Sequence, residues 1–268
     1  MTSLASRISA GPALADFRRA AGLLRVIAFM AMGDLRARYR RSVLGPFWMT
    51  LGTAAGTLGL GLVWSELLRM DRASFVPSLT AGLIMWQLLS GCIVEATTTY
   101  WRQSAILRNL SVPLSMPPIQ MLLKHLINFL HNLPVLVVVL LAFDVAPGWT
   151  VLLAIPALVL VAANLLWMTL LFSMLGARFR DLEYVIGGVM PLLMFLSPVF
   201  YRPSYLPFNS HFVWFNPFSH MIEVVRYPLL GSVPPGFVLL TVSGMALGGW
   251  LLTLWLFNAK RDRIPYWL

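Results

Sequence analysis

The stretch Arg36-Ala-Arg-Tyr-Arg-Arg-Ser-Val-Leu-Gly-Pro-Phe-Trp48 joins a cluster of cations to a long apolar run. The cluster consists of four arginines: Arg36, Arg38, Arg40 and Arg41. The residues from Val43 to Ser65 that follow it are uncharged. Such a junction fixes the side of the bilayer on which the cationic end lies. It also places guanidinium groups at headgroup depth, where an anionic lipid or a pyrophosphate would bind.

Composition extends this interpretation to the whole chain. Of the 268 residues 59% are hydrophobic and 11% are charged, whereas a soluble domain carries about 25% charged residues. The 20 basic against 10 acidic residues would suggest nucleic acid in a soluble protein. Here the basic residues lie at the ends of apolar runs, so we expect no nucleic acid partner. Cys92 is the single cysteine, which excludes an internal disulfide, and no Cys/His zinc pattern is present.

The apolar runs predict an all-α integral membrane protein with six transmembrane helices. A hydrocarbon core of about 30 Å requires about 20 apolar helical residues. The stretches that qualify are Pro46–Leu68, Val76–Trp101, Ile119–Phe143, Trp149–Leu175, Tyr184–Phe200 and Phe237–Asn258. The chain is thus divided into a cytoplasmic N-terminal part (1–45), a transmembrane domain (46–258) and a cytoplasmic tail (259–268).

The basic residues are distributed unequally between the two sides. With both termini in the cytoplasm, sixteen of the 20 lie inside, and the outer ones are Arg69, Arg72, Arg202 and Arg226. This asymmetry predicts cytoplasmic N- and C-termini. Residues Met1–Phe17 lack the pattern of a cleaved signal peptide.

Before the first span we expect a basic amphipathic helix in the cytoplasmic interface. Arg18, Arg25 and Arg36 are 7 and 11 residues apart and would share one helical face. Apolar residues lie elsewhere on the same cylinder, which is typical of an interfacial helix. Gly33 is a candidate point for a break.

Two connections are unusual. The cytoplasmic loop 102–118 contains Ile106, Leu107, Arg108 and Leu110, and its apolar residues could form one exposed face of a short helix that ends before Pro113. That face would dock a cytoplasmic partner, or the loop is a simple linker. The outer segment 201–236 is rich in proline and aromatic residues, including Tyr201, Tyr205, Trp214, Phe215 and Phe218. It is either re-entrant and sheltered by protein or a loop on the lipid surface.

Polar groups within the spans are few and form no catalytic pattern. His131 and Asn164 are either functional or partners that hold helices together. Glu95 lies near a cytoplasmic span end, and no Walker A sequence is present. The pairs Gly52/Gly56 and Gly244/Gly248 match the small-xxx-small pattern, for which packing within the subunit is the simpler explanation.

Several of these segments resemble the transmembrane subunits of type-2 ABC polysaccharide exporters, the permeases for O-antigen, capsule and teichoic acid. The resemblance begins with Arg36–Trp48 and continues in Leu175-Gly-Ala-Arg-Phe-Arg-Asp-Leu182 and Phe195-Leu-Ser-Pro-Val-Phe-Tyr201. Asn216-Pro-Phe and Arg226-Tyr-Pro-Leu-Leu-Gly231 match the outer segment of the family. The paired prolines Pro117-Pro118 depart from its pattern.

The resemblance implies a homodimer in a bacterial inner membrane, paired with two cytoplasmic ATPase subunits that bind ATP and Mg. The substrate would be a polysaccharide linked to undecaprenyl pyrophosphate. Loop 102–118 would carry a coupling helix, and the segment after Tyr201 would form gate helices at the periplasmic exit. The arginine cluster would bind the pyrophosphate as it enters, or serve only to fix topology. Alternatives are a teichoic-acid or drug exporter, an integral membrane lipid-sugar enzyme and a secondary transporter.

Overall fold

The computed structural model describes residues 11–45, 47–67, 69–203 and 210–268, and this part of the chain contains helices and no β-strand. Five helices are long and apolar enough to cross a membrane. They are α4 (Phe47–Leu67), α5 (Arg72–Arg102), α7 (Met116–Ala142), α8 (Ala154–Arg178), which continues the 3-10 turn η1 (Gly148–Leu153), and α12 (Gly236–Lys260). The predicted all-α membrane fold is confirmed.

The fifth expected span is shorter than predicted. Helix α9 runs from Leu182 to Leu196 and ends four residues before Phe200. Ser197 adopts an extended conformation, with φ −91° and ψ 152°, because Pro198 follows it. At 1.5 Å per residue α9 is about 22 Å long, whereas the hydrocarbon core is about 30 Å thick. Crossing at this point therefore requires the turn after α9 as well as the helix.

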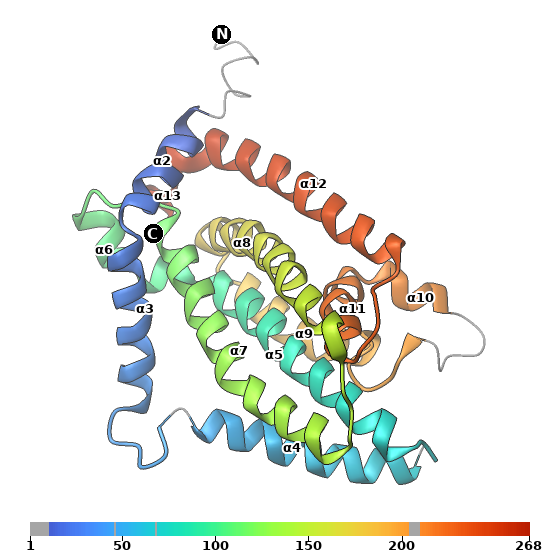
Figure 1. Cartoon of the computed structure of the whole chain (residues 1–268). Coiled ribbons are helices and arrows are strands. Elements are labelled where there is room, and N and C mark those ends of the chain that lie inside the picture. Colours follow the sequence, from blue (N-terminus) through green and yellow to red (C-terminus); the bar gives the residue numbers. More distant parts are fainter. Residues whose placement is uncertain (1–10, 46, 68, 204–209) are drawn as a thin grey trace.

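Helix α5 forms the centre of the bundle. In its most apolar window 67% of the residues are buried, against 17–33% in the other four span-length helices. Figure 1 shows α5, α7 and α8 side by side between α4 and α12, and α5 contacts α4, α7, α8, α9 and α11 (Pro217–Leu229). Most apolar side chains of α4 and α12 therefore remain exposed on the outside of the chain.

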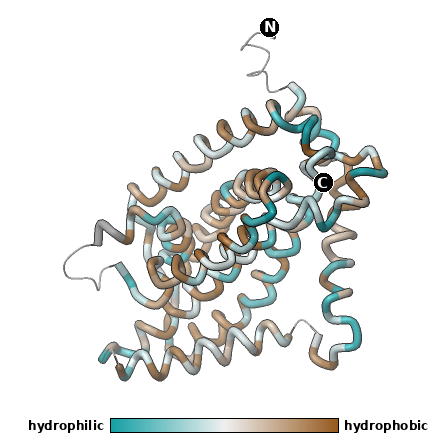
Figure 2. The backbone as a smooth tube through the Cα atoms, turned by 180° about the vertical axis from the view of Figure 1, so that it is seen from behind, coloured by the Kyte–Doolittle hydropathy of each residue, from teal (hydrophilic) through white to brown (hydrophobic). Residues whose placement is uncertain are grey.

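Both ends of the described chain lie at one end of the bundle. The amide of Ala13 on α2 (Gly11–Gly22) donates to Asn258 Oδ1 at 2.9 Å, and Arg261 Nη1 donates to the carbonyl oxygen of Pro12 at 2.9 Å. Helices α6 (Ser104–Asn109) and α13 (Ile264–Trp267) lie at the same end, where hydrophilic residues gather (Figure 2). Helices α10 (Ser210–Phe215) and α11 lie at the opposite end (Figure 1).

The N-terminal helix is broken at a different place from the one predicted. Helix α2 ends at Gly22 and α3 (Leu24–Tyr39) follows after Leu23, while Gly33 lies within α3 without interrupting it. Arg18 is therefore on a different helix from Arg25 and Arg36, although all three are exposed. The expectation of a single shared face was wrong.

Helix α3 buries one side in the subunit, and its interfacial location stays a prediction. Ile27, Ala31 and Leu35 are buried at four-residue spacing on the side of α3 that packs on α7. Phe29 is 75% exposed on the remaining surface. Figure 1 shows α3 running steeply across the direction of α4 rather than continuing it. Such a helix would lie along a membrane surface if α4 crosses the membrane.

The small-residue pairs do not pack within the subunit. A Cβ atom on Gly52, Gly56, Gly244 or Gly248 would meet no described atom within 4 Å. Gly61, one turn further along α4, instead packs against Val76, and a Cβ there would lie 3.2 Å from that side chain. The intramolecular explanation of the two pairs was therefore wrong, and their faces are free for another helix.

Candidate functional site

The four arginines of the junction lie at the elbow between α3 and α4. Arg36 and Arg38 are in the last turn of α3, and Arg40 is its C-cap. Arg41 has a φ of +70°, a left-handed conformation that turns the chain away from the helix axis. All four side chains are exposed, and none of them forms an ion pair or hydrogen bond with another residue that the structure describes. The elbow thus presents four guanidinium groups without a counter-ion.

Exposed apolar side chains surround these cations. Val43 is 99% exposed, and Phe47 and Trp48 in the first turn of α4 are also exposed. Aromatic rings beside arginine at the end of a span are typical of the membrane–water interface. The elbow therefore has the composition of a segment at headgroup depth.

Two cavities lie behind the elbow, the first among α3, α4, α5 and α7 and the second between α3 and α7. One, of about 280 Å³, is lined by Arg38 together with Gln87, His125 and Asn132. The other, of about 250 Å³, is lined by Arg36 and by apolar residues of α3. Asn128 lines both cavities, is 6% exposed, and its side-chain amide has no hydrogen-bond partner among the described residues. The amide of Asn128 is not one of the fully buried side-chain groups without a partner, so its polar atoms are accessible from the cavities to water or a polar ligand.

A cluster of uncharged polar side chains joins three spans next to the larger cavity. Thr53 on α4 donates to Asn132 Oδ1 on α7 at 3.0 Å, and Gln87 Nε2 on α5 donates to Thr53 Oγ1 at 3.1 Å. Asn132 Nδ2 also donates to Gln87 Oε1 at 3.2 Å. Each of these side chains thus has a hydrogen-bond partner within the cluster, as polar groups inside a membrane-spanning bundle require.

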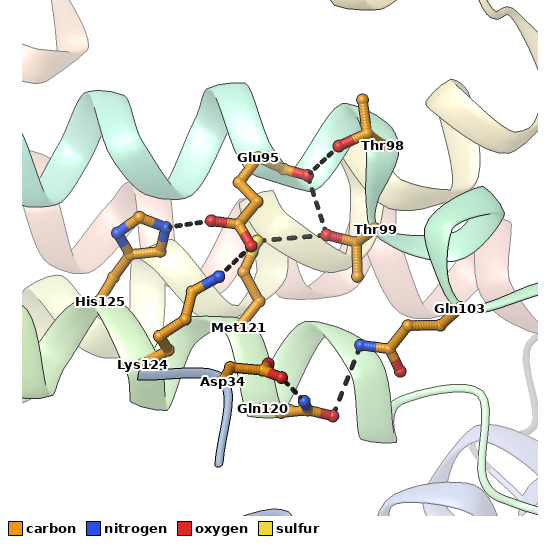
Figure 3. Close-up of polar contacts among 9 residues, drawn as sticks. All are labelled: Asp34, Glu95, Thr98, Thr99, Gln103, Gln120, Met121, Lys124 and His125. Carbon is orange, nitrogen blue, oxygen red and sulfur yellow. Dashed lines mark hydrogen bonds and ion pairs between the residues drawn. The ribbon is translucent and has the colours of Figure 1, made fainter. Parts of the chain in front are cut away.

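A charged cluster lies nearer the end of the bundle where α6 is located (Figure 3). The Glu95 carboxylate on α5 forms an ion pair with Lys124 on α7 and accepts a hydrogen bond from His125 Nε2 at 2.9 Å. The ring of His125 lies over Gly91, where a Cβ would come within 2.7 Å of it. Lys124 is 7% exposed, so the ion pair satisfies an almost completely buried charge.

A polar chain extends from this cluster to the interfacial helix. Gln120 Nε2 on α7 donates to Asp34 on α3 at 2.8 Å, and Gln103, the N-cap of α6, reaches Gln120 Oε1 at 3.5 Å (Figure 3). A cavity of about 190 Å³ lies among Asp34, Glu95, Lys124 and their neighbours. Helices α3, α5, α6 and α7 are thereby connected through side chains.

The predicted short helix is present as α6, which ends at Asn109 with Leu110 as its C-cap, before Pro113. Its apolar residues, however, do not share an exposed face. Leu107 is 7% exposed and packs with Tyr100 and Phe257, whereas Leu110 is 58% exposed. Ile106 is partly buried and Arg108 is exposed. The surface available to a partner is therefore formed by Leu110 and Arg108 rather than by Leu107.

The segment that follows α6 is fastened to α2. The buried Asp16 carboxylate accepts hydrogen bonds from the amide of Leu114 at 3.0 Å and from the amide and hydroxyl of Ser115 at 2.9 and 2.6 Å. Arg19 donates to the carbonyl oxygen of Ser111 at 2.7 Å. A displacement of α6 would thus be transmitted to α2.

At the opposite end, the predicted gate residues have different environments. Trp214 on α10 stacks edge-on against Phe237, with ring centroids 4.9 Å apart, and Phe218 packs against Trp86 at 5.8 Å. Phe215 is 84% exposed, and the half-buried Tyr201 donates to the carbonyl oxygen of Leu196 at 3.1 Å. Burial raises the pKa of the Tyr201 phenol, which stays protonated at neutral pH. Tyr205, also predicted here, lies outside the described residues.

Helix α11 carries a buried ion pair and is anchored by hydrogen bonds to the turn after α9. Glu223 and Arg226 are 3% and 1% exposed and pair with each other on α11. Arg226 Nη1 also donates to the carbonyl oxygen of Pro198 at 2.6 Å. Asn216, the N-cap of α11, donates to Ser197 Oγ at 2.8 Å. The segment is sheltered by protein at these points, as the re-entrant interpretation requires.

The polar residues singled out within spans have separate roles. Asn164 is fully buried and donates to the carbonyl oxygen of Val242 at 3.1 Å, which joins α8 to α12, so its role is structural. His131 is exposed and bonds to its own helix at Ile127. In the described ranges, no three His, Cys, Asp or Glu residues gather in a way that could hold a metal ion.

This chain is similar in amino-acid sequence to known proteins. The family model for the ABC-2 type transporter matches residues 25–230. A Klebsiella pneumoniae protein named O-antigen export system permease protein RfbA is 23% identical over 236 residues, which cover 84% of this chain and 91% of that protein. A protein of the same name from Myxococcus xanthus is 27% identical over 172 residues, or 64% of this chain and 66% of that protein. The chain belongs to the ABC-2 type transporter family of membrane permeases.

Proposed function

We propose that this chain is the membrane-spanning subunit of an ATP-driven exporter of O-antigen-like polysaccharide, and that the arginine elbow receives the pyrophosphate of a polyprenyl-linked glycan. The observation that carries the proposal is the exposure of Arg36, Arg38, Arg40 and Arg41 without counter-ions beside interfacial aromatic residues. Arginine binds phosphate oxygens through paired N–H groups. The named relatives support a polysaccharide as the cargo.

The topology supports a direction of transport. The two ends of the described chain lie at one end of the bundle, which favours an even number of crossings. With five span-length helices, the α9 segment would provide the sixth crossing. The excess of basic residues favours a cytoplasmic location for the common end, in a bacterial inner membrane. Glycan would enter at the arginine elbow and leave past α10 and α11.

Energy would come from a separate ATPase that binds ATP and Mg. Helix α6 would dock on it through Leu110 and Arg108, and the bonds from Asp16 to Leu114 and Ser115 would transmit the movement to α2. The unpacked glycine face of α4, together with its exposed leucines, favours a homodimer. Two copies would then enclose the path between them.

The test is a charge reversal at the elbow. The double variant Arg38→Glu/Arg40→Glu should reduce surface glycan to a few per cent of wild type while the protein inserts at a normal level, because phosphate and carboxylate repel. Arg18→Glu on α2 is the matched control, since Arg18 is also an exposed arginine at this end of the bundle. Normal glycan export by the double variant would overturn the pyrophosphate role.

A further inference from the structure

Another cavity, away from the arginine elbow, lies between the ends of α8, α12 and α13. Its volume is about 380 Å³. One part of its wall is apolar and includes Leu171, Leu175 and Leu256. The other part carries three cations, Arg178, Lys260 and Arg263. The cavity is therefore amphiphilic, and its two parts differ in the kind of group that they would accept.

The cations lie where two spans end. Arg178 is the last residue of α8, Lys260 is the last residue of α12, and Arg263 follows in the 3-10 turn η3 (Arg261–Arg263). The apolar wall comes from the preceding turns of the same two spans. Basic residues at a span end next to an apolar surface occupy the depth of lipid headgroups, with acyl chains below.

No acidic side chain lines this cavity. In the residues described, Arg178, Lys260 and Arg263 form no ion pair, and the neighbouring Asp262 is turned to solvent beside Arg261, with its side chain 93% exposed. The C-terminal ends of α8 and α12 add a partial negative charge of about half a unit each. Three full positive charges exceed this, so the polar part of the cavity remains electropositive.

Arg178 is held in place by aromatic rings. Its guanidinium carbon lies 5.8 Å from the centroid of Trp267 and 5.9 Å from that of Phe179. A guanidinium that stacks on a ring keeps its N–H groups free along its edge, where phosphate oxygens bind. The cation is thus partly ordered before any ligand arrives.

We propose that this cavity binds one anionic diacyl phospholipid, with its phosphate among Arg178, Lys260 and Arg263 and an acyl chain along Leu171, Leu175 and Leu256. The apolar wall distinguishes a lipid from free phosphate, which would gain nothing from it. The cavity is lined by the ends of α8 and α12 and by α13, and by none of the elbow residues. The proposal is therefore independent of the glycan cargo.

The test is lipid binding by the purified full-length permease in detergent, measured by native mass spectrometry during titration with phosphatidylglycerol or phosphatidylcholine. Wild type should retain phosphatidylglycerol selectively. Neutralising Arg178, Lys260 and Arg263 to Gln, singly and together, should weaken retention about fivefold per cation removed. Arg180→Gln is the matched control, because Arg180 is an exposed arginine two residues from Arg178 that does not line the cavity.

A second variant tests the cavity itself rather than the charge. Leu256→Trp fills the apolar part and leaves all three cations in place, so it should also abolish selective retention. Equal retention of both lipids by wild type, or unchanged retention in the triple variant, would overturn the proposal. Displacement of the lipid by millimolar inorganic phosphate would also overturn it.

Discussion

Arg226 on α11 donates a hydrogen bond to the main-chain carbonyl oxygen of Pro198 at 2.6 Å and so joins α11 to the turn after α9. The same guanidinium pairs with Glu223 on its own helix, and both side chains are almost completely buried. Gly82 on α5 makes room for this joint, because a Cβ there would lie 2.7 Å from the carbonyl oxygen of Val199. The turn after α9 is therefore held by α5 and α11 together.

Replacing Arg226 should destabilise the folded protein. Arg226→Gln leaves the Glu223 carboxylate buried without its partner, and we expect a loss of about 3–5 kcal/mol of stability. The melting temperature in detergent is the measurement. The control is Arg202→Gln, which removes the partly buried Arg202 bonded to Ser78 Oγ at 3.1 Å and should change melting little. Equal melting of both variants would contradict a supporting role for the buried pair.

The ion pair between Glu95 and Lys124 should behave as a coupled unit. Glu95→Gln alone strands the buried Lys124 ammonium and should destabilise the protein more than the double change Glu95→Gln/Lys124→Met does. A double-mutant cycle on thermal stability should give a coupling energy of about 0.5–3 kcal/mol. Strictly additive effects would show that the contact contributes nothing to stability.

Two leucines of the coupling segment should separate docking from folding. Leu110→Asp changes an exposed side chain, so the melting temperature should stay normal. ATP hydrolysis by the partner ATPase should then continue without glycan export. Leu107→Ala removes a buried side chain and should lower stability by about 2–5 kcal/mol. Ile106→Asp should show some of both effects, because Ile106 is partly buried. Normal coupling in the Leu110→Asp variant would exclude this surface as the docking site.

Substitutions of two glycines on α4 should separate an effect on dimer contact from an effect on subunit folding. Gly56→Leu projects from a face without internal contacts and should lower the fraction of dimer, measured by cross-linking, with unchanged subunit folding. Gly61→Leu would collide with Val76 and should destabilise the subunit itself. A normal dimer fraction in the Gly56→Leu variant would argue against this face as the dimer contact.

The length and hydropathy of the apolar runs predicted the membrane-spanning helices, because a bilayer requires a minimum length and an apolar composition of each span. The sequence did not predict features that depend on contacts with residues distant in the chain. Leu107 has the spacing of an exposed helix face, yet it is buried in an apolar cluster whose other members, such as Tyr100 and Phe257, come from elsewhere in the chain. The break at Leu23 follows Gly22, the last residue of α2, and glycine is typical of helix ends. Gly33 has the same local preference but lies within α3, which packs on α7, so the sequence alone could not tell which glycine marks the break.

The polar contacts were found only in part. Glu95 was visible as a charge near a cytoplasmic span end, but its pairing with Lys124 and His125 needs α5 and α7 to be in register. Asn128 carries no signal in sequence, and its role at two cavities depends on the elbow folding back over α7. The arginine elbow itself was predictable, because the arginines and the apolar run that follows them are contiguous in the chain.

The central claim is that this permease moves a lipid-linked glycan when its ATPase partner hydrolyses ATP. The direct measurement uses proteoliposomes that contain both subunits and undecaprenyl-pyrophosphate-linked glycan, with glycan protection from an external glycosidase followed over time. We expect ATP to change the protected fraction with the wild-type permease. We expect no change with the Arg38→Glu/Arg40→Glu variant, or with a non-hydrolysable ATP analogue in place of ATP. Movement that is independent of ATP, or no movement by a complex that hydrolyses ATP at a normal rate, would contradict the central claim.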